Sequence, residues 1–472
     1  AGTATLQVVH GAAAQIQLTP APTMIESGQT STLTATIQDA IGNTVTSATG
    51  SSFQISLLQT MGAGLVTDIT VTCTSGAPCR IDPTSGVATK VVTGDKVGSV
   101  GIEARATISS QTISSPTIFL TVSAGLPASI VLTATGLTIG TPDTLASGDT
   151  AVLTATLLDS RGNVANTSTD TVTYEYVTNT GTITGLGSSA AVAGVGTRSV
   201  VGSLVGPLTV RAKSTVASTL LVSNTLGFTV TPGAAATLTI TTQPSGGSVG
   251  SALTNQPVVQ VRDAAGNAVP TSGITVTAAL VSGAGLNTGT VNGDIALSDT
   301  SGTSTFTAAS VVGNAGDYRM EFSAPGLASV QSSTFTLTKQ DQTVTFTDPA
   351  GVTFGAAPFT VTPTSTSGLD VTVTSLTPAI CTATGTNGTT ITIVGAGLCQ
   401  LQGAQSGNAR YSAAPLVTAS FTITKATQPA LSFSSPSAVS YGGQITLGAS
   451  GGAGTGAISY TVSPDSACTV AL

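Results

Sequence analysis

Residues 33–43 read LTATIQDAIGN, and a stretch of the same kind returns as LTATLLDSRGN at 153–163 and as VQVRDAAGN at 259–267. Apolar and polar residues alternate in the first half of each copy, which is the period-2 pattern of a strand with one buried face. The Asp-x-x-Gly-Asn that ends each copy is typical of a turn, because Asp caps its own backbone and Gly and Asn tolerate positive φ. Repetition at about the spacing of one domain predicts an array of similar units.

The composition favours folded β-structure. The chain has 472 residues, enough for about three to five domains. Charged residues make up only 7%, but hydrophobic residues make up 40%, so the chain has enough apolar surface to fold. Thr and Val favour strands, and the 55 Gly residues interrupt helices. We therefore predict an all-β protein. Because aromatic residues are only 4% and Trp is absent, its cores are expected to consist of Val, Leu, Ile and Ala.

Residue types exclude several function classes. The net charge is −7 with a pI of about 4.5, and no basic cluster exists for binding nucleic acid. No apolar run is long enough to span a membrane. The single histidine, His10, argues against a Ser-His-Asp triad, and the acidic residues are scattered at turns rather than paired. We therefore expect no enzyme activity and no cofactor.

A recurring junction, in which one strand meets the next across a few small residues, divides the chain into units. Residues 1–11 are expected to be the closing strand of a preceding domain. Three long units are predicted at 12–124, 125–232 and 233–339, a shorter unit of another subtype at 340–425, and the N-terminal part of a fifth, truncated unit at 426–472. The spacers are short and contain Pro or Gly, which restricts bending between units more than a long flexible linker would.

In residues 12–339 the units resemble the bacterial Ig-like domains that are strung in tandem in large surface proteins, including the invasin and intimin type. The resemblance rests on the strand that ends in Asp-x-x-Gly-Asn, with Asp39, Asp159 and Asp263 as the first residues of the three turns. It implies tandem Ig-like β-sandwich domains in an elongated array. The antibody-type pair of cysteines around a core Trp is absent.

The last two units share a second pattern and are similar to Ig-like repeats of bacterial secreted proteins. Cys381 and Cys468 follow an aromatic-Gly pair at the same interval, and the fourth unit then adds Cys399. We predict a disulfide between Cys381 and Cys399. By the same register, the partner of Cys468 is expected beyond residue 472. Disulfides indicate an oxidising, extracellular setting.

Two further sites are weighed from the sequence. Cys73 and Cys79 flank Thr-Ser-Gly-Ala-Pro and are candidates for a small disulfide-closed loop. Asp39, Asp159 and Asp263 are weak candidates for Ca²⁺ ligands, because oxygen ligands suit this ion. Each turn offers only one carboxylate and one amide, which is too few, so plain turn chemistry is the favoured interpretation and no metal is predicted.

The leading hypothesis is a non-enzymatic extracellular structural protein: a segment of a bacterial surface stalk, of an adhesin shaft or of a surface filament. The expected partners are other copies or neighbouring domains of the same protein, and a host or surface glycan or protein bound through a region outside these residues. The strand faces carry little Lys, which leaves lateral packing of chains as an open alternative. A different class, the polysaccharide-binding or spacer region of a secreted multidomain enzyme, requires a platform of exposed Trp or Tyr.

Overall fold

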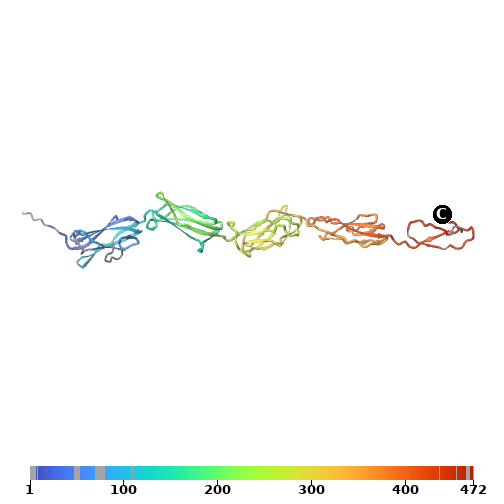
Figure 1. Ribbon diagram of the computed structural model, residues 1–472, viewed down its shortest axis with the longest axis horizontal. Coiled ribbons are helices and arrows are strands. Elements are labelled where there is room, and N and C mark those ends of the chain that lie inside the picture. The colour runs from blue at the N-terminus through green and yellow to red at the C-terminus, as the bar shows by residue number, and fades with distance from the viewer. Residues whose placement is uncertain are drawn as a thin grey trace, which may run out of the picture.

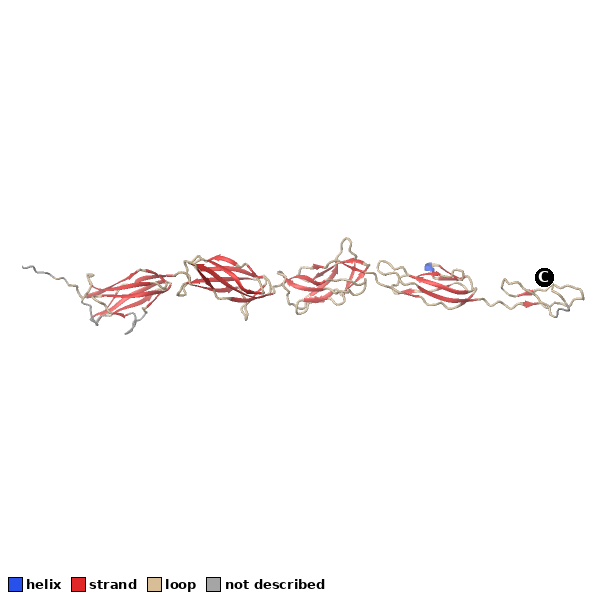
Figure 2. Cartoon of the chain, turned by 45° about the horizontal axis from the view of Figure 1, so that its top comes forward, coloured by secondary structure: helices blue, strands red, loops and turns tan. Residues whose placement is uncertain are grey.

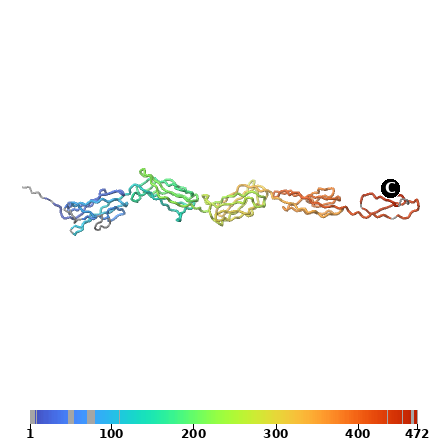
Figure 3. Tube along the Cα trace, viewed as in Figure 1, coloured from blue at the N-terminus to red at the C-terminus, as the bar shows by residue number. Residues whose placement is uncertain are grey.

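The computed structural model describes residues 7, 9–46, 54–69, 80–108, 110–434, 436–452, 454–463 and 468–470. The chain forms a row of five β-structured bodies along one axis, each joined to the next by one short segment (Figures 1 and 3). The closing strand expected within residues 1–11 and the loop between Cys73 and Cys79 lie largely or wholly outside the described residues.

The first sandwich packs a sheet of order β1-β3-β7-β5 against a sheet of order β2-β10-β8-β4-β6, with β9 paired to β8. This arrangement matches the two sheets of an Ig-like domain, with strands A-B-E-D in one and G-F-C in the other. The strands are β1 (Ala13–Ala21), β2 (Met24–Glu26), β3 (Thr30–Asp39), β4 (Ile55–Met61), β5 (Leu65–Thr67), β6 (Arg80–Ile81), β7 (Val87–Lys96), β8 (Gly98–Ile108), β9 (Gln111–Ser114) and β10 (Ile118–Ser123).

The second sandwich repeats this topology strand for strand. Its sheets have the orders β11-β13-β17-β15 and β12-β20-β18-β14-β16, with β19 paired to β18. The strands are β11 (Ser129–Thr135), β12 (Thr144–Ala146), β13 (Thr150–Leu158), β14 (Thr171–Asn179), β15 (Ile183–Thr184), β16 (Gly187–Ala190), β17 (Val195–Gly202), β18 (Gly206–Val216), β19 (Thr219–Val222) and β20 (Leu226–Thr231).

The third sandwich has shorter strands and more interruptions. Its sheets have the orders β21-β22-β26, β25-β23-β29-β30, β24-β27 and β28-β31. The strands are β21 (Ala235–Thr242), β22 (Val258–Asp263), β23 (Thr275–Leu280), β24 (Gly289–Asn292), β25 (Ile295–Leu297), β26 (Thr303–Thr305), β27 (Ser310–Gly313), β28 (Gly316–Tyr318), β29 (Met320–Ser323), β30 (Val330–Gln331) and β31 (Phe335–Leu337).

The fourth sandwich contains the sheets β33-β40-β39-β36, β34-β38-β37 and β32-β35, and the last body contains the pair β41-β42 (Figure 2). The elements are β32 (Val344–Thr345), β33 (Val352–Thr353), β34 (Phe359–Thr360), β35 (Thr364–Ser365), β36 (Thr372–Ser375), β37 (Cys381–Thr384), the 3₁₀ helix η1 (Thr386–Gly388), β38 (Thr390–Ile393), β39 (Gly397–Ala404), β40 (Val417–Thr424), β41 (Ser432–Phe433) and β42 (Ala449–Ser450).

Alternation along the strands produces the cores. In β3 every second residue is buried, so that Leu33, Ala35 and Ile37 are at most 1% exposed while the Thr residues between them face outward. The period-2 prediction is thereby confirmed, and β13 and β22 repeat the pattern. Each of the first four sandwiches has its own cluster of buried residues. A sandwich therefore does not depend on its neighbour for its hydrophobic core.

The expected core composition is correct only for the first sandwich. Its described core is built from Ile, Leu, Val and Ala. The second core contains Tyr174 and Phe228, and the third contains Tyr318 and Phe322 among other aromatic residues. The described aromatic core residues thus lie in the later sandwiches.

At the outer edge of the second sandwich, one side chain occupies the backbone of a strand residue. Asn224 accepts a hydrogen bond from the Leu132 amide at 2.9 Å and donates one to the Leu132 carbonyl at 3.1 Å. Both backbone groups of this edge residue in β11 are therefore occupied, which blocks them from pairing with a strand of another molecule. In the third sandwich the backbone of Ala328 covers the corresponding edge. These contacts oppose the lateral packing that the low Lys content suggests.

Candidate functional site at the joints between sandwiches

The three Asp-x-x-Gly-Asn turns are closed by their Asp side chains, as the sequence predicts. In the third copy, Oδ1 of Asp263 accepts hydrogen bonds from the amides of Ala265 at 3.0 Å and Asn267 at 2.8 Å. Gly266 has φ of 88°, which glycine adopts without strain. The same contacts recur in the other two copies. Positive φ is needed at the Gly only, because none of the three Asn residues adopts it.

The second carboxylate oxygen of each Asp holds the linker that enters its sandwich. Oδ2 of Asp159 accepts a hydrogen bond from the amide of Gly125 at 3.2 Å, and Oδ2 of Asp263 accepts one from Gly233 at 3.0 Å. In the first sandwich Oδ2 of Asp39 accepts the corresponding bond from a linker glycine at 2.9 Å. Each linker is therefore fixed to the sandwich that follows it, about 30 residues before the Asp in sequence.

At the first joint, Asn163 reaches across to the preceding sandwich. Its Nδ2 donates hydrogen bonds to Ser27 Oγ at 3.0 Å in the β2–β3 turn and to the Asp95 carbonyl at 2.8 Å near the end of β7. In return, the amide of Val97 donates to Asn163 Oδ1 at 3.3 Å. Nδ2 of Asn163 also contacts Asp159 Oδ2 at 3.1 Å, so the same carboxylate orients the amide and the linker.

The second joint repeats these contacts with equivalent residues. Nδ2 of Asn267 donates to Ser147 Oγ at 3.1 Å and to the Ser203 carbonyl at 2.7 Å, and the Val205 amide donates to Asn267 Oδ1 at 3.0 Å. Asn163 and Asn267 are both only 9% exposed. A buried amide that uses both its donor and its acceptor on the neighbouring sandwich fixes orientation as well as distance, because each hydrogen bond is directional.

One contact at the first joint has no counterpart at the second. Nη1 of Arg161 lies 3.8 Å from Asp95 Oδ1, and both side chains are partly exposed. An exposed ion pair of this length contributes little, about 0–1 kcal/mol. At the second joint Ala265 and Ser203 take these places, and the Asn267 bonds are kept. The shared part of the joint is therefore the Asn side chain and not the ion pair.

The third joint is built differently. Val249 holds the place of Ser27 and Ser147, since in all three cases the amide donates to the carbonyl at the end of the last strand of its own sandwich. The fourth unit has no Asp-x-x-Gly-Asn turn. A backbone hydrogen bond from Ala315 to the Ala409 carbonyl, at 3.0 Å, connects these two sandwiches instead. The Ser and the Asn are thus present together at two joints and absent together at the third.

The three carboxyl groups are held ionised by their partners. The linker amide of Gly11, together with the amides of the turn, lowers the pKa of Asp39 to about 2 despite burial. Burial raises the pKa of Asp263, but hydrogen bonds from the Asn267 side chain and from the linker and turn amides outweigh it and lower the pKa to about 2. Burial likewise opposes ionisation of Asp159, whose pKa is nevertheless lowered by the equivalent hydrogen bonds.

The weak Ca²⁺ candidates Asp39, Asp159 and Asp263 lie at equivalent places in three different sandwiches. Each carboxylate already accepts hydrogen bonds on both oxygens from amides. Within the described ranges, no three His, Cys, Asp or Glu side chains gather as a metal site would require. What the arrangement can do chemically is position one sandwich on the next.

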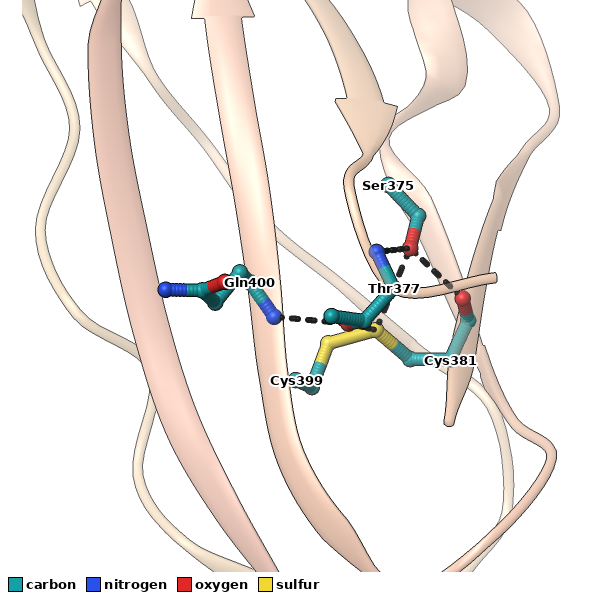
Figure 4. Close-up of a disulfide and its surroundings, with 5 residues drawn as sticks. All are labelled: Ser375, Thr377, Cys381, Cys399 and Gln400. Carbon is teal, nitrogen blue, oxygen red and sulfur yellow. Dashed lines mark hydrogen bonds between the residues drawn. A yellow bond between two sulfur atoms is a disulfide. The ribbon is translucent and has the colours of Figure 1, made fainter. Parts of the chain in front are cut away.

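The predicted disulfide between Cys381 and Cys399 is present. The two half-cystines are fully buried, with Cα atoms 5.7 Å apart, and connect β37 in one sheet to β39 in the other. Around them, Ser375 Oγ donates to the Cys381 carbonyl at 2.7 Å, and Thr377 Oγ1 accepts from the Gln400 amide at 3.0 Å (Figure 4). Cys468 is an exposed free thiol.

The function of the Asn and the Ser was not predicted from the sequence. The sequence explains the Asn by its tolerance of positive φ, which it does not use. The missed signal is a Ser-Gly-x-Thr turn at 27–30 and again at 147–150, each of which precedes a unit with Asp-x-x-Gly-Asn. This pairing of motifs in successive units is visible in the sequence once joints are considered.

No protein-family model matches the chain, and no curated protein is similar to it at a significant level. Among solved structures, the chain is similar to the Escherichia coli adhesin FdeC, with 16% identity over 70% of this chain and 100% of that one and a TM-score of 0.36. It is similar to an intimin fragment, with 16% identity over 43% and 94% of the two chains and a TM-score of 0.25. It is also similar to domains 4–9 of the surface layer protein SbsC, with 16% identity over 89% and 68% and a TM-score of 0.21.

The expected architecture, Ig-like β-sandwiches in an elongated row, is confirmed by the strand order and by the arrangement in Figure 1. Within the part of the chain that the structure describes, no helix is long and apolar enough to cross a membrane.

Proposed function

We propose that this chain is a rigid segment of a non-enzymatic extracellular stalk or fibre of a bacterial surface, whose task is to hold what it carries at a fixed distance and direction. The observation that carries the proposal is the repeated joint, in which Asn163 and Asn267 are buried against the preceding sandwich. A flexible tether needs no such contact, because a linker alone sets its reach.

The dimensions support this role. A strand of about ten residues spans about 33 Å, so four sandwiches placed end to end extend over on the order of 130 Å. The polar joints fix successive sandwiches at one angle, and the buried disulfide of the fourth sandwich restrains its unfolding. Disulfide formation supports a location outside the cell.

The experiment compares Asn163→Ala and Asn267→Ala with a control at the same position of the first sandwich, Asn43→Ala. Asn43 belongs to the equivalent turn of the first sandwich but is exposed and contacts no other sandwich among the described residues. Small-angle X-ray scattering and negative-stain electron microscopy measure the longest dimension and the spread of bend angles. Each joint variant is expected to shorten the average length and widen the angle distribution at its own joint.

The control is expected to leave both quantities unchanged. If the two joint variants also leave length and angles unchanged while every sandwich still melts as in the parent protein, the rigid-stalk proposal is wrong. The sandwiches would then be held apart only by their linkers.

The alternative of a polysaccharide-binding region has no specific observation in its favour. Tyr174 and Tyr318 are buried in the cores of the second and third sandwiches. Tyr441 is exposed but lies in the last body. Trp is absent from the chain. Stacking on a sugar requires several exposed rings on one face. In the last body the exposed Phe433 lies with its ring centroid 6.0 Å from that of the half-buried Tyr460, and this pair alone does not make such a platform.

A further inference from the structure

The N-terminal end of the first sandwich carries the receiving half of a joint with nothing seated on it in the described structure. Asp39 accepts hydrogen bonds from Ile41 at 3.1 Å and Asn43 at 2.9 Å through Oδ1, and from Gly11 at 2.9 Å through Oδ2. Oδ2 also accepts a bond from Asn43 Nδ2 at 3.1 Å. These contacts are those that orient Asn163 and Asn267 at the two complete joints.

The difference lies in the burial of the amide. Asn163 and Asn267 are 9% exposed, because each is covered by a Ser-bearing turn of the preceding sandwich, whereas Asn43 is exposed. Asp39 therefore orients the Asn43 side-chain amide as Asp159 and Asp263 orient Asn163 and Asn267. In the described structure, no acceptor or donor of a preceding sandwich contacts the Asn43 amide. Within the described first sandwich the Asn43 side chain donates to Asp39, which supports the turn, but it has none of the cross-joint partners of Asn163 and Asn267.

We propose that this end is a docking surface for one further sandwich of the same type, joined through the segment that ends at Gly11. The matching end presents three groups: a Ser hydroxyl in the turn before its second long strand, a carbonyl, and an amide two residues later. The inference depends on the joint geometry and holds wherever the array is located.

A second copy of this chain does not fit as the occupant. Of the sandwiches described, only the first and second carry the Ser, and Ser27 and Ser147 are already covered by Asn163 and Asn267. The third presents Val249, whose side chain offers no acceptor. The occupant must therefore be another sandwich with a free Ser end. The Gly11–Asp39 bond fixes the incoming segment along the path that the linkers take at the two complete joints.

The turn also indicates the character of the occupant. Ile41 is 86% exposed and holds the position of Arg161, which contacts Asp95 of the preceding sandwich at the first joint. An exposed Ile cannot pair with a carboxylate, and burying it against one has a desolvation cost. The occupant is therefore expected to carry an uncharged residue at the place of Asp95, as the second sandwich does with Ser203.

The test grafts a copy of residues 125–232 directly before Gly11 of the chain, replacing residues 1–10, so that the linker has the length of the second joint. The reporter is the backbone amide of Val205 in the added copy, which is expected to donate to Asn43. In the parent chain the Val205 amide donates to Asn267 in the same way at the second joint. Hydrogen exchange measured by NMR compares the grafted chain with the same chain carrying Asn43→Ala. We expect the substitution to speed exchange of this amide by about tenfold or more, the effect of losing about 1–2 kcal/mol of joint contacts.

Two controls make the result decisive. Ser147→Val in the added copy, which imitates Val249, is expected to speed the same exchange. Asn43→Ala in the chain without the graft removes only the bond to Asp39 and is expected to leave exchange of the Val205 amide unchanged. Equal exchange with and without Asn43→Ala, in a grafted chain whose sandwiches all melt normally, would overturn the proposal. Concentration-dependent association of the unmodified chain that Asn43→Ala abolishes would also overturn it, by assigning this end to a second molecule.

Discussion

The two linker glycines at the complete joints respond differently to the same substitution. A Cβ added at Gly233 lies 2.3 Å from the backbone carbonyl oxygen of Ser147, whereas one added at Gly125 lies 3.5 Å from that of Ser27. Neither glycine has a φ in the left-handed region, so alanine adopts both backbones without intrinsic strain. Gly233→Ala thus tests a contact between sandwiches, and Gly125→Ala is its matched control.

The size of the effect follows from the geometry. Ordinary contacts of a Cβ begin at about 3.4 Å, so at position 233 the linker and the Ser147 backbone must separate by about 1 Å. A backbone oxygen cannot rotate away as a side chain can. A shift of this size lengthens the bond from the Gly233 amide to Asp263, now 3.0 Å, beyond hydrogen-bonding distance and strains the Asn267 contacts. Losing these contacts costs about 2 kcal/mol.

Hydrogen exchange of the Val205 amide measures this loss directly, because that amide donates to Asn267 across the joint. About 2 kcal/mol corresponds to exchange about thirtyfold faster in Gly233→Ala. The Val97 amide, which reports on the first joint, is expected to keep its rate. In Gly125→Ala both rates are expected to stay within a factor of about two of the parent protein. Unchanged Val205 exchange in Gly233→Ala, or equal acceleration in both variants, would refute the steric argument.

Acid is expected to loosen the second joint. The folded-state pKa of Asp263 is about 2, against an ordinary value of 3.8. The ionised carboxylate therefore contributes about 2 kcal/mol of stability above pH 3.8, and this contribution is lost as the pH falls toward 2. Scattering measured over this range should show the rod bending, and Asp263→Asn should reduce the dependence. Replacing Cys381 and Cys399 together by Ser should destabilise the fourth sandwich by about 3 kcal/mol, from the 18-residue separation, with the earlier calorimetric transitions unmoved. Asn224→Ala should destabilise the second sandwich by about 1–3 kcal/mol and promote association in sedimentation experiments; a monomer of unchanged stability would contradict its role at the edge.

The strands and the disulfide were predictable because their signals are local or periodic. Alternation in 33–37 marks a buried face whatever the rest of the chain does, and the interval to Cys381 repeats in the next unit. The joints were not predictable in this way, because Asn163 contacts Ser27 at a separation of 136 residues and Asn267 contacts Ser147 at 120. No periodicity connects such positions, and an Asn after a Gly is explained well enough by a turn.

A joint made of a few hydrogen bonds is suited to sandwiches that already have complete cores. Each net hydrogen bond contributes about 1 kcal/mol, so the Asn267 contacts contribute a few kcal/mol, less than the roughly 5–15 kcal/mol typical of a folded domain. The linker keeps the two faces at high effective concentration, and the joint therefore stays closed at rest without being strong. Under tension along the rod, the joints between the first three sandwiches are expected to open before any sandwich unfolds. Because Asp263 holds both Gly233 and Asn267, an opened joint retains the orientation that it needs to close again.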